Sequence, residues 1–217
     1  MSEQKSSIML VDDHPLLRKG LKQLLALEDE LEVIAEASNG QDAIKLAAEL
    51  DPDLIILDLN MQGMDGLETL KRMRDEGVTS RIVMLTVSDA DEDIVKAISN
   101  GADGYLLKDT DPEVLLDQIK KALEGKMVLS EAITQVLATA LRRPQAKTPA
   151  ELNSLTNREY EILHLIAKGM SNKVIARELN ISDGTVKVHV KHLLKKLGLR
   201  SRVEAAVWMV NQQGGKL

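Results

Sequence analysis

The stretch Leu54-Ile55-Ile56-Leu57-Asp58-Leu59-Asn60-Met61 is an apolar run interrupted by a carboxylate. A continuous apolar run of this length, bounded by turn residues, predicts a strand that is buried on both faces of a parallel sheet. Ligands of open α/β sheets bind outside the carboxyl ends of the strands. Asp58 therefore marks a candidate site.

Three further apolar runs also end in polar side chains: residues 8–11 before Asp12 and Asp13, residues 82–85 before Thr86, and residues 105–107 before Lys108. If these runs are neighbouring parallel strands, one cleft holds three acids, a hydroxyl and an ammonium group. Clustered carboxylates repel one another unless a cation joins them. Oxygen ligands beside a phosphoryl group suit Mg²⁺. The residues therefore predict a phosphoryl-accepting aspartate with a magnesium site.

The first part of the chain alternates short apolar runs with longer amphipathic ones. Strands are expected at 7–11, 32–36, 53–57, 81–85 and 104–107, and helices at 15–27, 40–50, 65–75, 90–100 and 111–123. This alternation indicates βαβ units and a parallel sheet. With acids after the first and third strands, we expect a flavodoxin-like (βα)5 fold whose site lies at the switch point of the strand order.

Length and composition narrow the classes of protein. The 217 residues are enough for two domains, and the absence of cysteine excludes disulfides and thiolate chemistry. No apolar stretch approaches the ~20 residues that span a bilayer, and the first residues are polar. We therefore expect no membrane association and a cytoplasmic location.

The net charge is divided unevenly along the chain. Residues 1–130 carry 27 acidic and 14 basic side chains (−13), whereas residues 151–217 carry 6 and 11 (+5). This division suggests that only the second half meets nucleic acid, although an unevenly charged solvated surface is the simpler alternative.

The second half is expected to be helical. We predict a first domain at 1–126, a helix (130–141) and a proline-containing linker (142–150) within 127–150, and a second domain at 151–217. The helices of the second domain are expected at 157–167, 171–179, 183–197 and 201–211. The tight turn at 180–184 and the basic helix after it indicate a small all-α helix-turn-helix domain that binds double-stranded DNA.

The helix at 183–197 has one apolar and one basic face. Lys187, Val188 and Lys191 lie away from the apolar stripe, so we expect them to contact base edges. Three other lysines are expected near phosphates: Lys173, Lys195 and Lys196. An ordinary basic amphipathic helix is the alternative.

Both halves are similar to known families. Asp12-Asp13, Asp58, Thr86 and Lys108 together resemble the quintet of a two-component receiver domain, over about residues 6–125. The motifs at 155–159, 169–176 and 185–189 resemble the LuxR-type DNA-binding domain. The combination is that of the NarL/FixJ class of response regulators. Within that class the motifs at 12–15, 57–61, 101–109 and 185–191 look most similar to the nitrate/nitrite response regulators.

The resemblance implies roles for individual residues. Asp58 would accept a phosphoryl group from a sensor histidine kinase, and Mg²⁺ would be held by Asp13, Asp58 and the Asn60 backbone carbonyl, with Asp12 assisting. Alternatively, Asp12 and Asp13 cap the helix that begins near Pro15.

The remaining members of the receiver site would act on the phosphoryl group or respond to it. Thr86 and Lys108 would contact phosphoryl oxygens, and Tyr105 would change position with Thr86 unless it simply packs in the core. Gln62 departs from the family, which usually has proline there. The family also implies a homodimer on DNA, paired through the last helix, and RNA polymerase as a partner.

Two other functions compete with this interpretation. An aspartate-nucleophile phosphohydrolase needs a second aspartate two residues after the nucleophile, and that position is Asn60. A receiver that acts only through protein contacts would not need a basic helical half. We expect no enzyme activity beyond self-phosphorylation from a donor and autodephosphorylation. The four histidines are not expected to form a metal site: His14, His164, His189 and His192.

Overall fold

The computed structural model describes residues 5–126 and 154–214. The helix predicted at 130–141 and the linker predicted at 142–150 lie outside these residues. The domain boundaries predicted around them therefore stay predictions.

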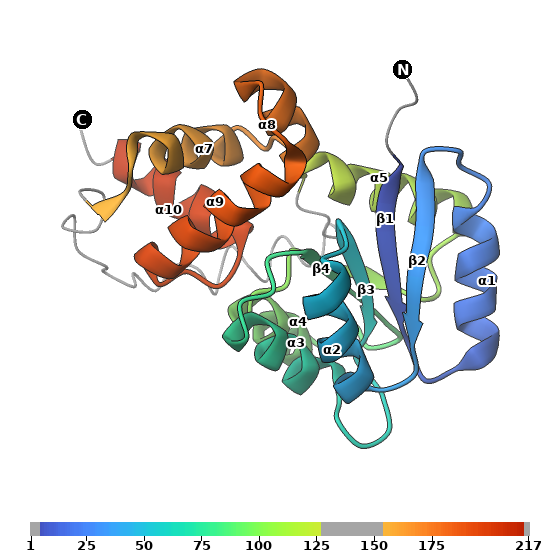
Figure 1. Ribbon diagram of the computed structural model, residues 1–217. Coiled ribbons are helices and arrows are strands. Elements are labelled where there is room, and N and C mark those ends of the chain that lie inside the picture. The colour runs from blue at the N-terminus through green and yellow to red at the C-terminus, as the bar shows by residue number, and fades with distance from the viewer. Residues whose placement is uncertain (1–4, 127–153, 215–217) are drawn as a thin grey trace.

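The first domain is built on one parallel sheet of five strands (Figure 1). The strands are β1 (Ser6–Val11), β2 (Leu31–Ala37), β3 (Leu54–Asp58), β4 (Arg81–Thr86) and β5 (Gly104–Leu107). Their order in the sheet is β2-β1-β3-β4-β5, so the order reverses between β1 and β3. This arrangement confirms the predicted flavodoxin-like fold and its switch point.

Helices cover both faces of the sheet. They are α1 (Pro15–Leu25), α2 (Gly40–Leu50), α3 (Gly66–Asp75), α4 (Asp91–Ser99) and α5 (Pro112–Glu124). Successive strand side chains point to opposite faces, so Ile55 and Leu57 join the core under α2, α3 and α4. Leu54 and Ile56 join the core under α1 and α5. Burial on both faces explains why β3 is uniformly apolar before Asp58.

The second domain contains four helices around its own core. They are α7 (Asn157–Ala167), α8 (Asn172–Leu179), α9 (Asp183–Leu197) and α10 (Arg202–Gly214). Asn180 has a left-handed backbone conformation that ends α8, and the Ser182 side chain caps α9 by accepting from the Thr185 N–H. The short turn between these caps confirms the predicted helix-turn-helix unit.

The two domains contact each other through α8, α9 and the amino-terminal edge of the sheet (Figure 1). The strands run from this edge to the carboxyl edge, where Asp58 lies. The candidate phosphoacceptor and the domain contact are therefore at opposite ends of β3. In the described part of the chain, no helix has the length and apolar character needed to cross a membrane.

Candidate functional sites

The sheet brings the residues of the first candidate site together at its carboxyl edge. Asp12 follows β1, Asp58 ends β3, Thr86 ends β4 and Lys108 follows β5. The Lys108 ammonium lies 2.8 Å from Asp12 Oδ2 and 2.9 Å from Asp58 Oδ2. Both carboxylates are buried: the exposed fraction of Asp12 is 3% and that of Asp58 is 2%. One ammonium thus joins two buried acids from different strands.

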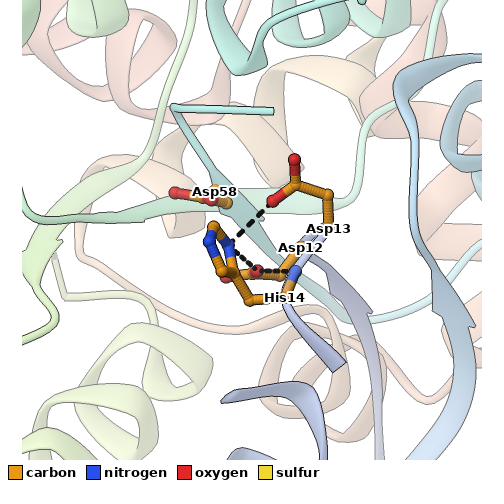
Figure 2. Close-up of side chains that lie close together, drawn as sticks. All are labelled: Asp12, Asp13, His14 and Asp58. Atoms are coloured by element: carbon orange, nitrogen blue, oxygen red, sulfur yellow. Dashed lines mark hydrogen bonds and ion pairs between the residues drawn. The ribbon is translucent and has the colours of Figure 1, made fainter. Parts of the chain in front are cut away.

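The site also has the oxygen donors that a hard divalent cation needs. Figure 2 shows Asp12, Asp13, His14 and Asp58 converging, and one ligand atom from each lies within 4.8 Å of the others. Three carboxylates in this space fit the chemistry of Mg²⁺. The backbone N–H of Asn60 donates to Asp58 Oδ1 over 3.3 Å, which keeps the loop that carries the Asn60 carbonyl beside the acids.

His14 is an exposed histidine that lies beside the acidic cluster. Its Nδ1 lies 2.8 Å from Asp13 Oδ1 and 3.3 Å from Asp12 Oδ1, so this histidine belongs to the acidic cluster (Figure 2). Its adjacency to the two aspartates was the available signal in the sequence. A cation entering the site must share these carboxylates with the imidazole.

Burial controls the electrostatics of Asp58. Desolvation raises the pKa of this carboxyl group and the neighbouring charge of Asp12 adds to the increase, while the hydrogen bond and charge of Lys108 oppose it. One lysine does not fully compensate two buried acids. A divalent cation at this position would favour the ionised, nucleophilic form of Asp58.

Thr86 and Tyr105 are linked through a residue that the sequence analysis did not single out. The Ser88 N–H donates to Thr86 Oγ1 over 3.1 Å, and the Tyr105 hydroxyl donates to the Ser88 carbonyl oxygen over 2.9 Å. Burial raises the pKa of Tyr105 to about 12, so its hydroxyl remains protonated and can donate. A movement of Thr86 would therefore displace Ser88 and change the hydrogen bond that Tyr105 donates to it.

Gly66 was also missed, although it lies at the start of α3 just after the helix cap Asp65. A Cβ at this position would lie 2.1 Å from the Asp58 carbonyl oxygen. The glycine therefore lets α3 approach the backbone of the phosphoacceptor loop.

Gln62, where the family usually has proline, contributes to the acidic cluster through its backbone. Its N–H donates to Asp13 Oδ2 over 2.9 Å, a hydrogen bond that proline could not donate.

The second candidate site is the basic face of α9. Val186, Val190, Leu193, Leu194 and Leu197 are buried in the domain core, as the apolar stripe predicts. Val188 is 52% exposed, and Lys191 and Lys195 are exposed. Lys196 is different, because its ammonium lies 2.6 Å from the buried Glu159 carboxylate that caps α7.

Two of the predicted DNA contacts instead bind the first domain. Lys187 Nζ donates to the Asp51 carbonyl oxygen over 2.7 Å and lies 3.4 Å from Asp53 Oδ1. Lys173 Nζ donates to Ser6 Oγ over 3.1 Å and lies 3.4 Å from Asp53 Oδ2. Burial alone would raise the pKa of Asp53, but the Ser7 hydrogen bond and the two lysine charges lower it. The acidic partners Asp51 and Asp53 had no recognisable signal in the sequence.

Comparisons with known proteins agree with the two domains of the fold. Residues 8–120 match the response regulator receiver domain, and residues 153–209 match the LuxR family of bacterial regulatory proteins. The chain is 56% identical over 208 residues to the nitrate/nitrite response regulator protein NarL of Escherichia coli strain K12, covering 96% of each. It is 51% identical over 209 residues to NarP of that strain, again covering 96% of each.

A solved structure gives the same result for the fold. The response regulator ChrA of a heme-sensing two-component system is 33% identical, with 96% of this chain and 98% of that chain covered and a TM-score of 0.51.

A receiver sheet with its acidic site, joined to a LuxR-type helical domain, defines the two-component response regulators that bind DNA. The chain belongs to this family and is close to the nitrate/nitrite regulators NarL and NarP. Membership implies a kinase and DNA as partners, and a regulatory role in place of a metabolic enzyme activity.

Proposed function

We propose that Asp58 is the phosphoacceptor and that its phosphorylation controls DNA binding by the second domain. The observation that carries this proposal is the Lys108 ammonium between Asp58 and Asp12. An Asp58 oxygen attacks phosphorus, the bond from phosphorus to the kinase histidine breaks, and the histidine leaves with the bonding electron pair. Thr86 and Lys108 then contact oxygens of the transferred group.

Mg²⁺ would be held by Asp13, Asp58 and the Asn60 carbonyl, with Asp12 assisting. The bound ion supplies positive charge against the charge that develops on the phosphoryl oxygens. Catalysis by the chain itself is limited to this transfer and to hydrolysis of its own phosphoaspartate. A phosphohydrolase acting on other substrates is disfavoured, because Asn60 stands where the general acid would be.

Phosphoryl uptake from acetyl phosphate and Mg²⁺ tests the assignment. We expect Asp58→Asn to abolish incorporation of label and Asp13→Ala to weaken Mg²⁺ binding. Asp109→Asn is a matched control, because Asp109 is an exposed carboxylate next to Lys108. Label incorporation at the wild-type rate in Asp58→Asn would show that the acceptor lies elsewhere.

The DNA-binding surface is proposed to be the exposed face of α9. Lys187, Val188 and Lys191 would reach base edges, and lysine can bond guanine O6 and N7 while valine packs on a thymine methyl group. Three lysines would contact phosphates: Lys173, Lys195 and Lys196. Pairing of two chains through α10 is supported by its exposed Val207 and Val210, 40% and 56% accessible. RNA polymerase would be the protein partner that contacts the DNA-bound dimer.

The unphosphorylated chain is proposed to be closed. Lys173 and Lys187 cannot contact DNA while they bind Asp53 and the start of the sheet. A coupling free energy of ~1–3 kcal/mol between phosphorylation and opening would change DNA affinity about 5- to 150-fold. The link from Thr86 through Ser88 to Tyr105 is a candidate for the first step of this coupling.

The regulated genes are proposed to respond to nitrate or nitrite, and the protein to act in the cytoplasm. The support is the identity to NarL and NarP over nearly the whole chain. Selection of bound genomic fragments, with and without acetyl phosphate, tests this assignment. We expect fragments near genes of nitrate and nitrite metabolism to be enriched after phosphorylation, and enrichment of unrelated genes would contradict it.

A further inference from the structure

A cavity of about 320 Å³ lies between the two domains at the amino-terminal edge of the sheet. Its basic lining residues come from both domains: Arg81, Lys120, Lys173, Arg177, Lys187 and Arg202. Its acidic lining residues are fewer: Glu30, Asp51, Asp53 and Glu124. The walls therefore carry excess positive charge, although the protein as a whole is acidic.

Arg81 is buried here, and no carboxylate within residues 5–126 and 154–214 forms a salt bridge with it. It begins β4, is 6% exposed, and its Nη1 donates to the Ala122 carbonyl oxygen at the end of α5. Its Nη2 is buried with no hydrogen-bond partner, and Arg81 forms no salt bridge with any carboxylate in the described residues. A buried charge is costly unless it is paired.

Arg202 presents a second guanidinium from the other domain that has no salt bridge in the described part of the chain. It is 7% exposed and donates to the Asn172 side-chain oxygen over 3.1 Å and to the Met170 carbonyl oxygen. Burial lowers its pKa to about 10. Burial also lowers the pKa of Arg81, and the charge of Arg202 lowers it further, so the two cations repel each other across the domain contact.

The nearby acids Asp53, Asp103 and Asp183 form their salt bridges with other cations, although one oxygen each of Asp103 and Asp183 has no hydrogen-bond partner in the described residues. Asp103, whose charge acts on both arginines, lies 2.8 Å from a guanidinium nitrogen of Arg74. Asp53 lies within 3.4 Å of both Lys173 and Lys187. Among the residues that the structure describes, no salt bridge therefore joins Arg81 or Arg202 to a carboxylate.

We propose that this cavity binds a phosphate-class oxyanion between Arg81 and Arg202, either free phosphate or the phosphoryl end of a small metabolite. Guanidinium groups bind tetrahedral oxyanions through paired hydrogen bonds, and a turn of the Arg81 side chain toward the cavity would give its enclosed, unsatisfied Nη2 a partner. The cavity lies at the lower end of the ~300–1,000 Å³ found for small-molecule pockets. Such a ligand would bridge the two domains.

If the proposed function holds, a ligand that bridges the two domains would also affect DNA binding. Lys173 and Lys187 line the same cavity, so a ligand that holds the domains together keeps these lysines away from DNA. The oxyanion would then oppose phosphorylation of Asp58, because the ligand and the phosphoryl group favour different arrangements.

Direct titration tests the site without DNA. Orthophosphate and glycerol 3-phosphate are titrated calorimetrically into the full chain at constant ionic strength, in buffer without Mg²⁺. The test variants are Arg81→Met and Arg202→Met, with Arg177→Gln as an exposed substitution that leaves the core intact. Lys121→Gln is the control, since Lys121 is the exposed neighbour of Lys120 and does not line the cavity. A further variant, Lys108→Met, removes the ammonium group that could bind an added anion at the receiver site.

We expect one equivalent to bind, with affinity at least 10-fold lower in Arg81→Met and Arg202→Met and several-fold lower in Arg177→Gln. Lys121→Gln and Lys108→Met should bind like the wild type. Tighter binding of orthophosphate identifies the free ion, and tighter binding of the ester identifies a phosphorylated metabolite. Absence of saturable binding to the wild type, binding that is unchanged in all three cavity variants, or binding lost in Lys108→Met overturns the proposal. DNA binding by the same variants is measured separately, so failure of this site leaves the proposed function intact.

Discussion

Asp58 is held in an unfavourable ionic state by its surroundings. Burial raises its pKa and the Asp12 charge raises it further, while Lys108 and the hydrogen bond from the Asn60 N–H oppose the increase. A carboxyl group whose folded pKa is raised binds its proton more tightly in the folded protein. Its favourable contribution to stability is present below the ordinary carboxyl pKa of ~3.9 and is lost as pH rises through the raised value.

The first prediction is that Asp58→Asn stabilises the metal-free protein near pH 7. We expect the free energy of unfolding to increase by ~1–2 kcal/mol, because the amide carries no buried charge. In a domain of this size each kcal/mol raises the Tm by about 4 °C. The gain should shrink near pH 4 and when Mg²⁺ is added. Thermal unfolding at both pH values measures it. A gain of the same size at pH 4 and pH 7 would contradict the electrostatic explanation.

The second prediction concerns Gly66. Alanine there would bring a Cβ to 2.1 Å from the Asp58 carbonyl oxygen, so the phosphoacceptor loop or α3 must shift. We expect a loss of ~1–3 kcal/mol in stability and slower uptake from acetyl phosphate. Gly20→Ala is the control, since a Cβ at Gly20 meets nothing within 4 Å and α1 should gain ~0.5–1 kcal/mol. Normal phosphorylation of Gly66→Ala would show that the close approach has no functional role.

At the scale of elements, the spacing of the apolar residues and the positions of the turn residues predicted most of the helices and strands. The helix predicted at 183–197 has these bounds in the structure, and the strand predicted at 53–57 is found one residue later, at 54–58. The ends were less predictable: the helix expected at 15–27 stops at Leu25, where the Leu27 N–H donates to the Leu24 carbonyl oxygen in a tighter turn. Apolar Leu27 extends the pattern but is 75% exposed, so no core contact supports another helical turn.

The third prediction concerns α9 and separates base contacts from phosphate contacts. Lys191→Ala should cost ~1–3 kcal/mol on the specific duplex and relax preference at one or two base pairs. Lys195→Ala should weaken specific and scrambled duplexes alike and lower the dependence of binding on salt. We expect a smaller direct effect from Lys196→Ala on DNA, because Glu159 already engages that ammonium. Binding to both duplexes across a salt series measures these effects, and a uniform loss in Lys191→Ala would demote Lys191 to a phosphate contact.

At the scale of the whole molecule, the contact between the domains could not be predicted from the sequence. The opposite charges of the two halves indicated attraction but not its location. The location depends on Asp51, which ends α2 in a left-handed conformation with φ of 44° and offers its carbonyl oxygen to Lys187. The phosphoacceptor site differs, because Asp12, Asp58, Thr86 and Lys108 each end or directly follow an apolar run and the strand order brings them together.

The fourth prediction is that loosening this contact activates the unphosphorylated chain. Asp51→Asn together with Asp53→Asn removes the two first-domain carboxylates near Lys187 and leaves Asp183 of the same helix in place. We expect a 5- to 20-fold increase in affinity for specific DNA without a phosphodonor, with little change after phosphorylation. Asp109→Asn together with Glu113→Gln, which removes two exposed carboxylates, serves as the charge-matched control. An equal increase in both phosphorylation states would instead indicate a general electrostatic effect.

The most direct test of phosphorylation-controlled opening is the DNA affinity of the full chain with and without acetyl phosphate and Mg²⁺. It is measured beside Asp58→Asn and the fragment 150–217 at one salt concentration. We predict weak binding by the unphosphorylated chain, an increase of 5- to 150-fold toward or beyond the fragment's affinity on phosphorylation, and no response in Asp58→Asn. Equal affinity of the unphosphorylated chain and the fragment, or a wild-type response in Asp58→Asn, would contradict the account.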